Sequence, residues 1–124
     1  MSEHDEQAAF VEWLEWNHIK HYAIPNGGSR HKAEAARLKA EGVVPGVPDI
    51  CIPIPRGEKH GLYIEMKYGK NKTTDAQNKW IAYLSEAGYT CAVCYSATAA
   101  IKVTRGYLYE QSKKQATAEN AAPT

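Results

Sequence analysis

The spacing of hydrophobic and polar positions predicts a succession of helices and short strands. Residues 3–17 have helical periodicity, with an apolar stripe made of Phe10, Val11, Trp13 and Leu14. The run His-Tyr-Ala-Ile-Pro at 21–25 predicts a short strand that ends at a glycine-containing turn. Alanine-rich residues 31–41 predict a second helix with Gly42 as its C-terminal cap.

A β-hairpin is predicted in the middle of the chain. Apolar runs at 49–55 and 62–67 flank a polar turn and read as two strands. If the turn is centred near Gly57, antiparallel pairing places Asp49 opposite Glu65, since both are equally far from it in sequence. Two carboxylates are then expected to face each other across the hairpin.

This hairpin carries the candidate chemistry. Residues two apart on a strand share a face, so Lys67 lies beside Glu65, and three apolar positions point the other way: Leu62, Ile64 and Met66. Opposed carboxylates destabilise a ladder unless a cation lies between them, and Mg²⁺ prefers oxygen ligands. We therefore expect Asp49 and Glu65 to bind a metal that activates water, with Lys67 orienting that water or stabilising developing charge. The alternative is a solvated strand face carrying Glu65 and Lys67, with Asp49 as a turn residue.

The rest of the chain predicts a helix, a strand and a final helix. Thr74 and Gln77 form a capping box that opens the first of these helices. Gln77 either turns inward above the carboxylates or only caps the helix. The strand at 89–95 should run parallel to the Glu65 strand, and Ser96 should cap the last helix. Residues 110–124 are polar and alanine-rich and are expected to be a disordered tail.

On the first helix, Glu3 falls near the centre of the apolar stripe and Glu6 at its edge. An inward carboxylate at the helix start is a candidate third metal ligand, and the alternative is a fraying surface residue. Glu6 competes with Glu3 for this role.

Composition and charge narrow the class of protein. A chain of 124 residues that is 44% hydrophobic fits one domain. The net charge of +1 gives no global basic field, so affinity for DNA must come from local clusters. These clusters are Arg30, Lys32, Arg37 and Lys39 before the hairpin, and Lys67, Lys70 and Lys72 after it. Each is also compatible with ordinary solvated surface. The turn Asn26-Gly27-Gly28 would allow close approach to a phosphate, or is a plain turn.

Three cysteines, an odd number, fit a reducing compartment. There is no long apolar run and no signal-peptide pattern. We expect a soluble protein of the cytoplasm, in a bacterial or phage-infected cell, with no membrane partner.

The order of these motifs resembles the PD-(D/E)xK nuclease superfamily and, more closely, the short stand-alone members of the VRR-NUC family. The resemblance is carried by Asn26-Gly27-Gly28, Gly46-Val47-Pro48-Asp49, Glu65-Met66-Lys67, and Thr74 with Gln77 and Leu84. It implies an α/β fold with a restriction-endonuclease-like core, a mixed central β-sheet flanked by α-helices, over residues 1–109.

The resemblance also implies roles for particular residues. Metal ligands are implied at Asp49, at Glu65, at the backbone carbonyl of Met66 and at Glu3, which the position of Gln7 on the same stripe favours over Glu6. Lys67 is implied as the catalytic lysine, with a supporting role for Gln77. The contacts expected with DNA are Asn26, Gly27, Gly28, Arg30, Lys32, Arg37, Lys70 and Lys72.

The implied function is a Mg²⁺- or Mn²⁺-dependent endodeoxyribonuclease, a hydrolase acting on branched DNA such as four-way (Holliday) junctions. A homodimer is expected, because pairing doubles the phosphate-contacting surface of a small domain. The alternatives are a less selective nuclease on duplex or single-stranded DNA, and a non-catalytic DNA-binding module.

Overall fold

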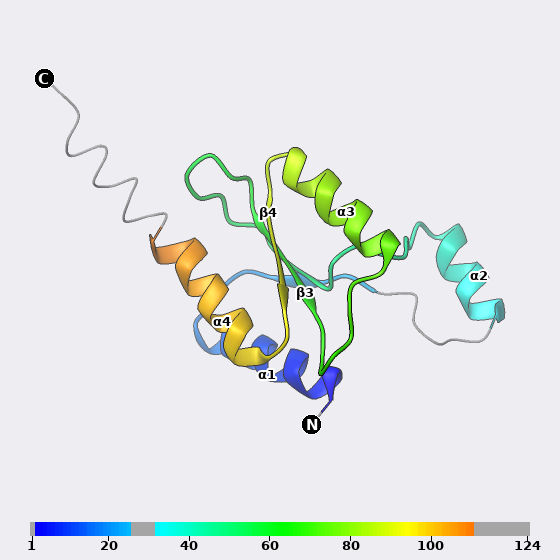
Figure 1. The fold of residues 1–124 in the computed structure, drawn as a ribbon, viewed down its shortest axis with the longest axis horizontal. Helices are drawn as coiled ribbons and strands as arrows, with labels where there is room; N and C mark the ends of the chain where they lie inside the picture. Colours follow the sequence, from blue (N-terminus) through cyan, green and yellow to red (C-terminus); the bar gives the residue numbers. More distant parts are fainter. Residues whose placement is uncertain (1, 26–31, 111–124) are drawn as a thin grey trace, which may run out of the picture.

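The computed structural model describes residues 2–25 and 32–110, in which helices surround a four-stranded sheet (Figure 1). The elements in chain order are α1 (Glu3–Trp16), β1 (Tyr22–Ala23), α2 (Lys32–Ala40), β2 (Ile50–Ile52), β3 (Leu62–Met66), α3 (Asp75–Glu86), β4 (Thr90–Cys94), α4 (Ala97–Arg105) and a π-helix η1 (Gly106–Glu110). The predicted helices, strands and hairpin are all present. The predicted α/β fold class is confirmed.

The sheet is mixed, with the strand order β1-β2-β3-β4. The first three strands are antiparallel and β4 is parallel to β3, as the crossover through α3 predicts. Helices α1 and α4 pack together on one face, and α3 lies on the other side of β4 (Figure 1). α2 stands apart from the sheet and buries none of its residues, because its alanines offer little apolar surface.

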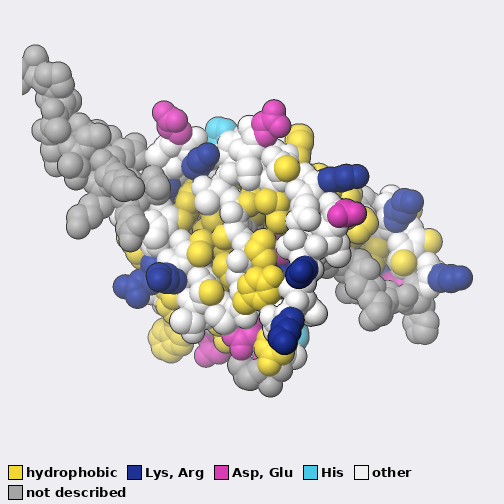
Figure 2. Space-filling view, viewed as in Figure 1, with side chains coloured by type: hydrophobic (Ala, Val, Ile, Leu, Met, Phe, Trp, Pro, Cys, Tyr) yellow, Lys and Arg dark blue, Asp and Glu magenta, His cyan; other side chains and the backbone are white. Residues whose placement is uncertain are grey.

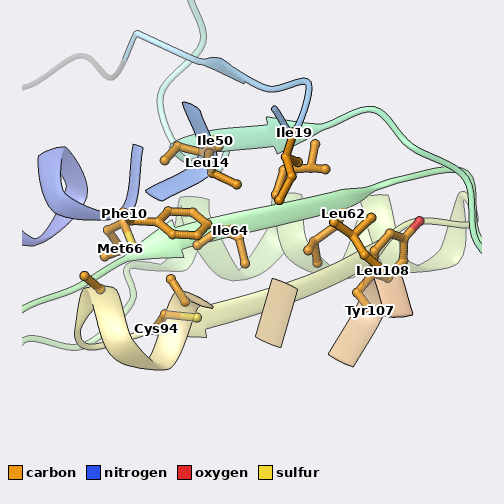
Figure 3. Close-up of a cluster of buried hydrophobic side chains, with 13 residues drawn as sticks. Phe10, Leu14, Ile19, Ile50, Leu62, Ile64, Met66, Cys94, Tyr107 and Leu108 are labelled. Carbon is orange, nitrogen blue, oxygen red and sulfur yellow. The ribbon is translucent and has the colours of Figure 1, made fainter. Parts of the chain in front are cut away.

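The hydrophobic core lies between the sheet and the α1–α4 layer. Figure 3 shows Phe10 of α1 beside Ile64 and Met66 of β3, and all three are fully buried. Alternation along β3 explains this, since even-numbered positions of the strand share one face. Truncating Phe10 to alanine would cost about 3–5 kcal/mol, as measured for large aromatic residues in other cores.

The loop before β2 packs closely against the start of α3. Gly46 has a φ of +97°, and a Cβ atom there would lie 2.8 Å from the backbone of Ala76. Only glycine lets this loop pack closely against the first turn of α3.

Glu6 accepts a hydrogen bond of 2.8 Å from the backbone N–H of Ala97, so α1 supplies a cap to α4.

The C-terminal elements brace the hairpin turn. The hydroxyl of Tyr107 donates to the Ile54 carbonyl at 2.6 Å, and Arg56 Nε donates to the Leu108 carbonyl at 2.8 Å. Ser96 caps α4 as predicted, but the chain continues into the π-helix Gly106–Glu110, which the sequence did not predict. The predicted tail lies outside the described residues from 111 onward. In the described part of the chain, no helix has the length and apolar character needed to cross a membrane.

Candidate active site

The hairpin has the predicted register. Ile50 pairs with Ile64 and Cys51 with Tyr63, so pairs of residues are equally distant from the turn. Continuing by one residue brings Asp49, just before β2, beside Glu65 on β3. The pairing of the two strands thus places the two carboxylates side by side.

These two carboxylates and the lysine are all buried. The exposed fractions are 7% for Asp49, 2% for Glu65 and 8% for Lys67. The Oδ2 atom of Asp49 accepts a hydrogen bond of 2.7 Å from the backbone N–H of Met66, which fixes the aspartate against the end of β3. The N–H of Lys67 donates to the Cys94 carbonyl at 2.9 Å, extending the β3–β4 ladder by one residue. A solvated strand face is therefore ruled out for these groups.

Burial strongly changes the acidity of Glu65. Loss of solvent raises the pKa of its carboxyl to about 9, and the negative charge of Asp49 and a hydrogen bond with it add to the rise. The Lys67 ammonium opposes the shift and the charge of Glu3 reinforces it. Without a cation, Glu65 is thus protonated at neutral pH, because the site cannot hold its second negative charge.

Gln77 both caps its helix and contacts the site. Its Oε1 atom accepts from the Thr74 N–H at 2.9 Å, completing the capping box of α3. Its Nε2 atom donates to Glu65 Oε2 at 3.3 Å. The two arrangements that the sequence left open therefore occur together, and the cap aims the amide group at Glu65.

Glu3 lies at the edge of the site. It lines a cavity of about 510 Å³ between α1 and the end of β1, and Asp49 lines the same cavity. Glu6 instead accepts a hydrogen bond from the start of α4, so the two carboxylates have different partners. A Glu3 side chain at this position lies close enough to raise the pKa of Glu65.

The donor set suits a hard cation. Glu65 Oε1 is buried and has no hydrogen-bond partner among the described residues, which is costly for a carboxylate oxygen. A divalent cation beside Asp49 would satisfy this oxygen and remove the repulsion between the two carboxylates. In the described part of the chain, no three His, Cys, Asp or Glu side chains form a ready cluster for an ion, so backbone carbonyl and water oxygens would complete the coordination.

The predicted DNA contacts occupy two separate surfaces. Lys70 and Lys72 are exposed on the loop after Lys67. Lys32 and Arg37 are exposed on α2, whose cationic side chains stand out at the right of Figure 2. The other four, Asn26, Gly27, Gly28 and Arg30, lie outside the described residues.

Sequence reasoning missed one contact that holds the loop after β3. The hydroxyl of Tyr95 donates to the carbonyl of Asn71 at 2.9 Å, which ties the loop carrying Lys70 and Lys72 to the end of β4. No sequence spacing connects Tyr95 to Asn71, because the contact depends on the parallel pairing of β3 with β4.

Comparisons with known proteins agree with this arrangement. Residues 1–98 match the VRR-NUC domain, a family of nuclease domains. Among solved structures, one described as a VRR_NUC domain protein is 30% identical, with a TM-score of 0.74 over 87% of this chain and 88% of that chain. No curated protein matches the chain.

Proposed function

We propose, because the chain belongs to the VRR-NUC domain family, that it is a divalent-metal-dependent endonuclease that cuts branched DNA, with four-way junctions as its main substrate. Family membership alone gives a nuclease-type protein with DNA as its substrate. The observation that carries the metal-dependent cleavage in this proposal is the buried group of Asp49, Glu65 and Lys67 at the end of the hairpin. Burying three ionisable groups together is costly and is typical of a functional site.

The metal ligands in this proposal are Asp49, Glu65 and the backbone carbonyl of Met66, with Glu3 contributing from the rim. Mg²⁺ or Mn²⁺ fits, since both favour carboxylate, carbonyl and water oxygens. When bound, the ion acidifies water and neutralises charge on the scissile phosphate. The hydrogen bond from the Met66 N–H fixes the orientation of the Asp49 carboxylate for this role.

Lys67 supplies the positive charge that the phosphate requires. Its side chain shares a face of β3 with Glu65, and its charge already acts on that carboxyl. An ammonium there donates hydrogen bonds to the attacking water or to a phosphate oxygen. Gln77 holds the Glu65 carboxyl in position through its Nε2 hydrogen bond.

Binding of the DNA backbone is assigned to the two basic surfaces. Lys70 and Lys72 would contact phosphates near the cut, and Lys32 and Arg37 on α2 would contact more distant ones. Arg37 also lies 4.0 Å from Glu41, an exposed pair that salt and DNA readily compete with.

A homodimer completes the proposal, with the open edge of β4 as its contact surface. In the described chain β4 is one of the two edge strands of the sheet, and its sequence Thr-Cys-Ala-Val-Cys carries no charge to block pairing. Val93 is 36% exposed, and Figure 2 shows hydrophobic side chains along this strand between α3 and α4. Val93→Lys should give a monomer by sedimentation, and a wild-type protein that is monomeric even with junction DNA would refute the dimer.

The substrate is tested with one labelled sequence in two forms. A four-way junction and the linear duplex of the same sequence are incubated with Mg²⁺, with Mn²⁺ and with chelator. We expect faster cutting of the junction and no cutting with chelator. Equal cutting of both forms would identify the less selective nuclease, and DNA binding without any cutting would identify the non-catalytic module.

A further inference from the structure

The cavity beside the carboxylates has two kinds of wall. Its volume is about 510 Å³, within the range of small-molecule sites. Glu3, His4 and Gln7 provide polar groups from the first turns of α1. Ala8, Val11 and Ile24 provide the apolar part, and Asp49 joins the cavity to the carboxylate pair. A lining that combines apolar side chains with a few polar groups is typical of a small-molecule site.

The proposed metal site decides which part of a nucleotide this cavity can take. The scissile phosphate would lie at the ion bound by Asp49 and Glu65, beside Lys67. The apolar part of the cavity lining, Ala8, Val11 and Ile24, then suits a sugar and a base. The Gln7 amide and the His4 ring offer hydrogen-bond donors and acceptors for a base edge.

We propose that this cavity holds the sugar and base of one nucleotide next to the scissile phosphate. The inference rests on the proposed nuclease function and adds a nucleoside subsite to it. A base must leave its stack to enter, which costs least where the DNA is already unpaired or distorted. A branch point meets that condition, so the subsite would favour branched over continuous duplex DNA.

Filling the cavity tests the subsite. Ala8 lines the cavity, so Ala8→Phe places an aromatic ring in it. Ala9→Phe is the control, because Ala9 is the next residue of α1 and is not among the residues that line the cavity. Both alanines are exposed. We expect Ala8→Phe to lower kcat/KM roughly 10- to 100-fold, the loss expected when one base loses its contacts. Ala9→Phe should stay within about twofold of wild type, and both variants should melt alike, because neither position is in the core.

A second arm changes the DNA and leaves the protein intact. After the cut is mapped, a single abasic analogue replaces each nucleotide flanking it in turn. Removing the base on one side should slow the wild-type enzyme by a similar factor, and should add little to the defect of Ala8→Phe.

The outcomes separate the two proposals. Wild-type protein that does not cut any DNA would refute the nuclease function, and the subsite falls with it. Wild-type cutting that is unaffected by an abasic analogue on either side would refute only the subsite. The subsite would also be refuted if the fold losses in kcat/KM from Ala8→Phe and from the abasic analogue multiply. Multiplying losses are independent, and two defects in one binding pocket are not.

Discussion

Glu65→Gln should stabilise the metal-free protein at alkaline pH while abolishing cleavage. Glu65 is buried beside Asp49, and burial raises the pKa of its carboxyl to about 9 from an ordinary value of 4.5. The folded protein therefore holds this proton over a pH range in which the unfolded chain has released it. A glutamine keeps the size and hydrogen-bonding ability of the protonated carboxyl and never ionises.

The magnitude follows from proton linkage. Since the folded state binds more protons, its stability falls as pH rises between these two pKa values. The fall is about 1.4 kcal/mol for each pH unit, so raising the pH from about 6 to about 8 should cost the wild type roughly 3 kcal/mol. Glu65→Gln should lack this component. Every other ionisable group is present in both proteins, so the comparison isolates the contribution of Glu65.

The assay is urea unfolding in chelator at several pH values, with the free energy of unfolding compared between the two proteins. The difference between them should grow with pH. Adding Mg²⁺ should then stabilise the wild type more at high pH, where the ion competes with fewer protons, and should have little effect on the variant. Parallel pH profiles for the two proteins would refute the account of a carboxyl forced to stay protonated.

Three further substitutions test separate parts of the site. Lys67→Ala should lower kcat by roughly 100-fold or more while DNA binding, measured by fluorescence anisotropy, persists; near-normal turnover would remove Lys67 from catalysis. Gln77→Glu keeps the helix-capping acceptor but replaces the donor to Glu65 with a second charge. Cleavage should fall roughly tenfold or more, and unchanged cleavage would limit Gln77 to capping. Gly46→Ala should cost roughly 1–3 kcal/mol from its positive φ alone, plus the clash with α3, in thermal unfolding; a neutral result would mean that this loop is not held as described.

The sequence predicted the hairpin because its chemistry is local. Alternation along residues 62–66 and a turn near Gly57 determine which positions oppose each other, and Asp49 and Glu65 follow from that register. The capping box at Thr74 was equally readable, since its partners are three residues apart.

Contacts between distant elements could not be read in the same way. The donor from Gln77 to Glu65 and the cap from Glu6 to Ala97 depend on how α3 and α1 pack on the sheet. Glu3 and Glu6 lie on one helix stripe, and only the position of α4 tells them apart. The π-helix at 106–110 has no sequence signal comparable to a capping residue or a hydrophobic periodicity. It coincides with the packing of Tyr107 and Leu108 in the core, which is a contact between distant parts of the chain.

In the proposed function, Asp49 and Glu65 together form a divalent-metal nuclease site. Cleavage of end-labelled junction DNA by wild type and Asp49→Asn, with Mg²⁺ and with excess chelator, tests this most directly. The asparagine can still accept the hydrogen bond from the Met66 N–H, so the fold should be retained. We predict cutting only by the wild type and only with Mg²⁺. Cutting by wild type in chelator, or by Asp49→Asn at a comparable rate with Mg²⁺, would contradict the account.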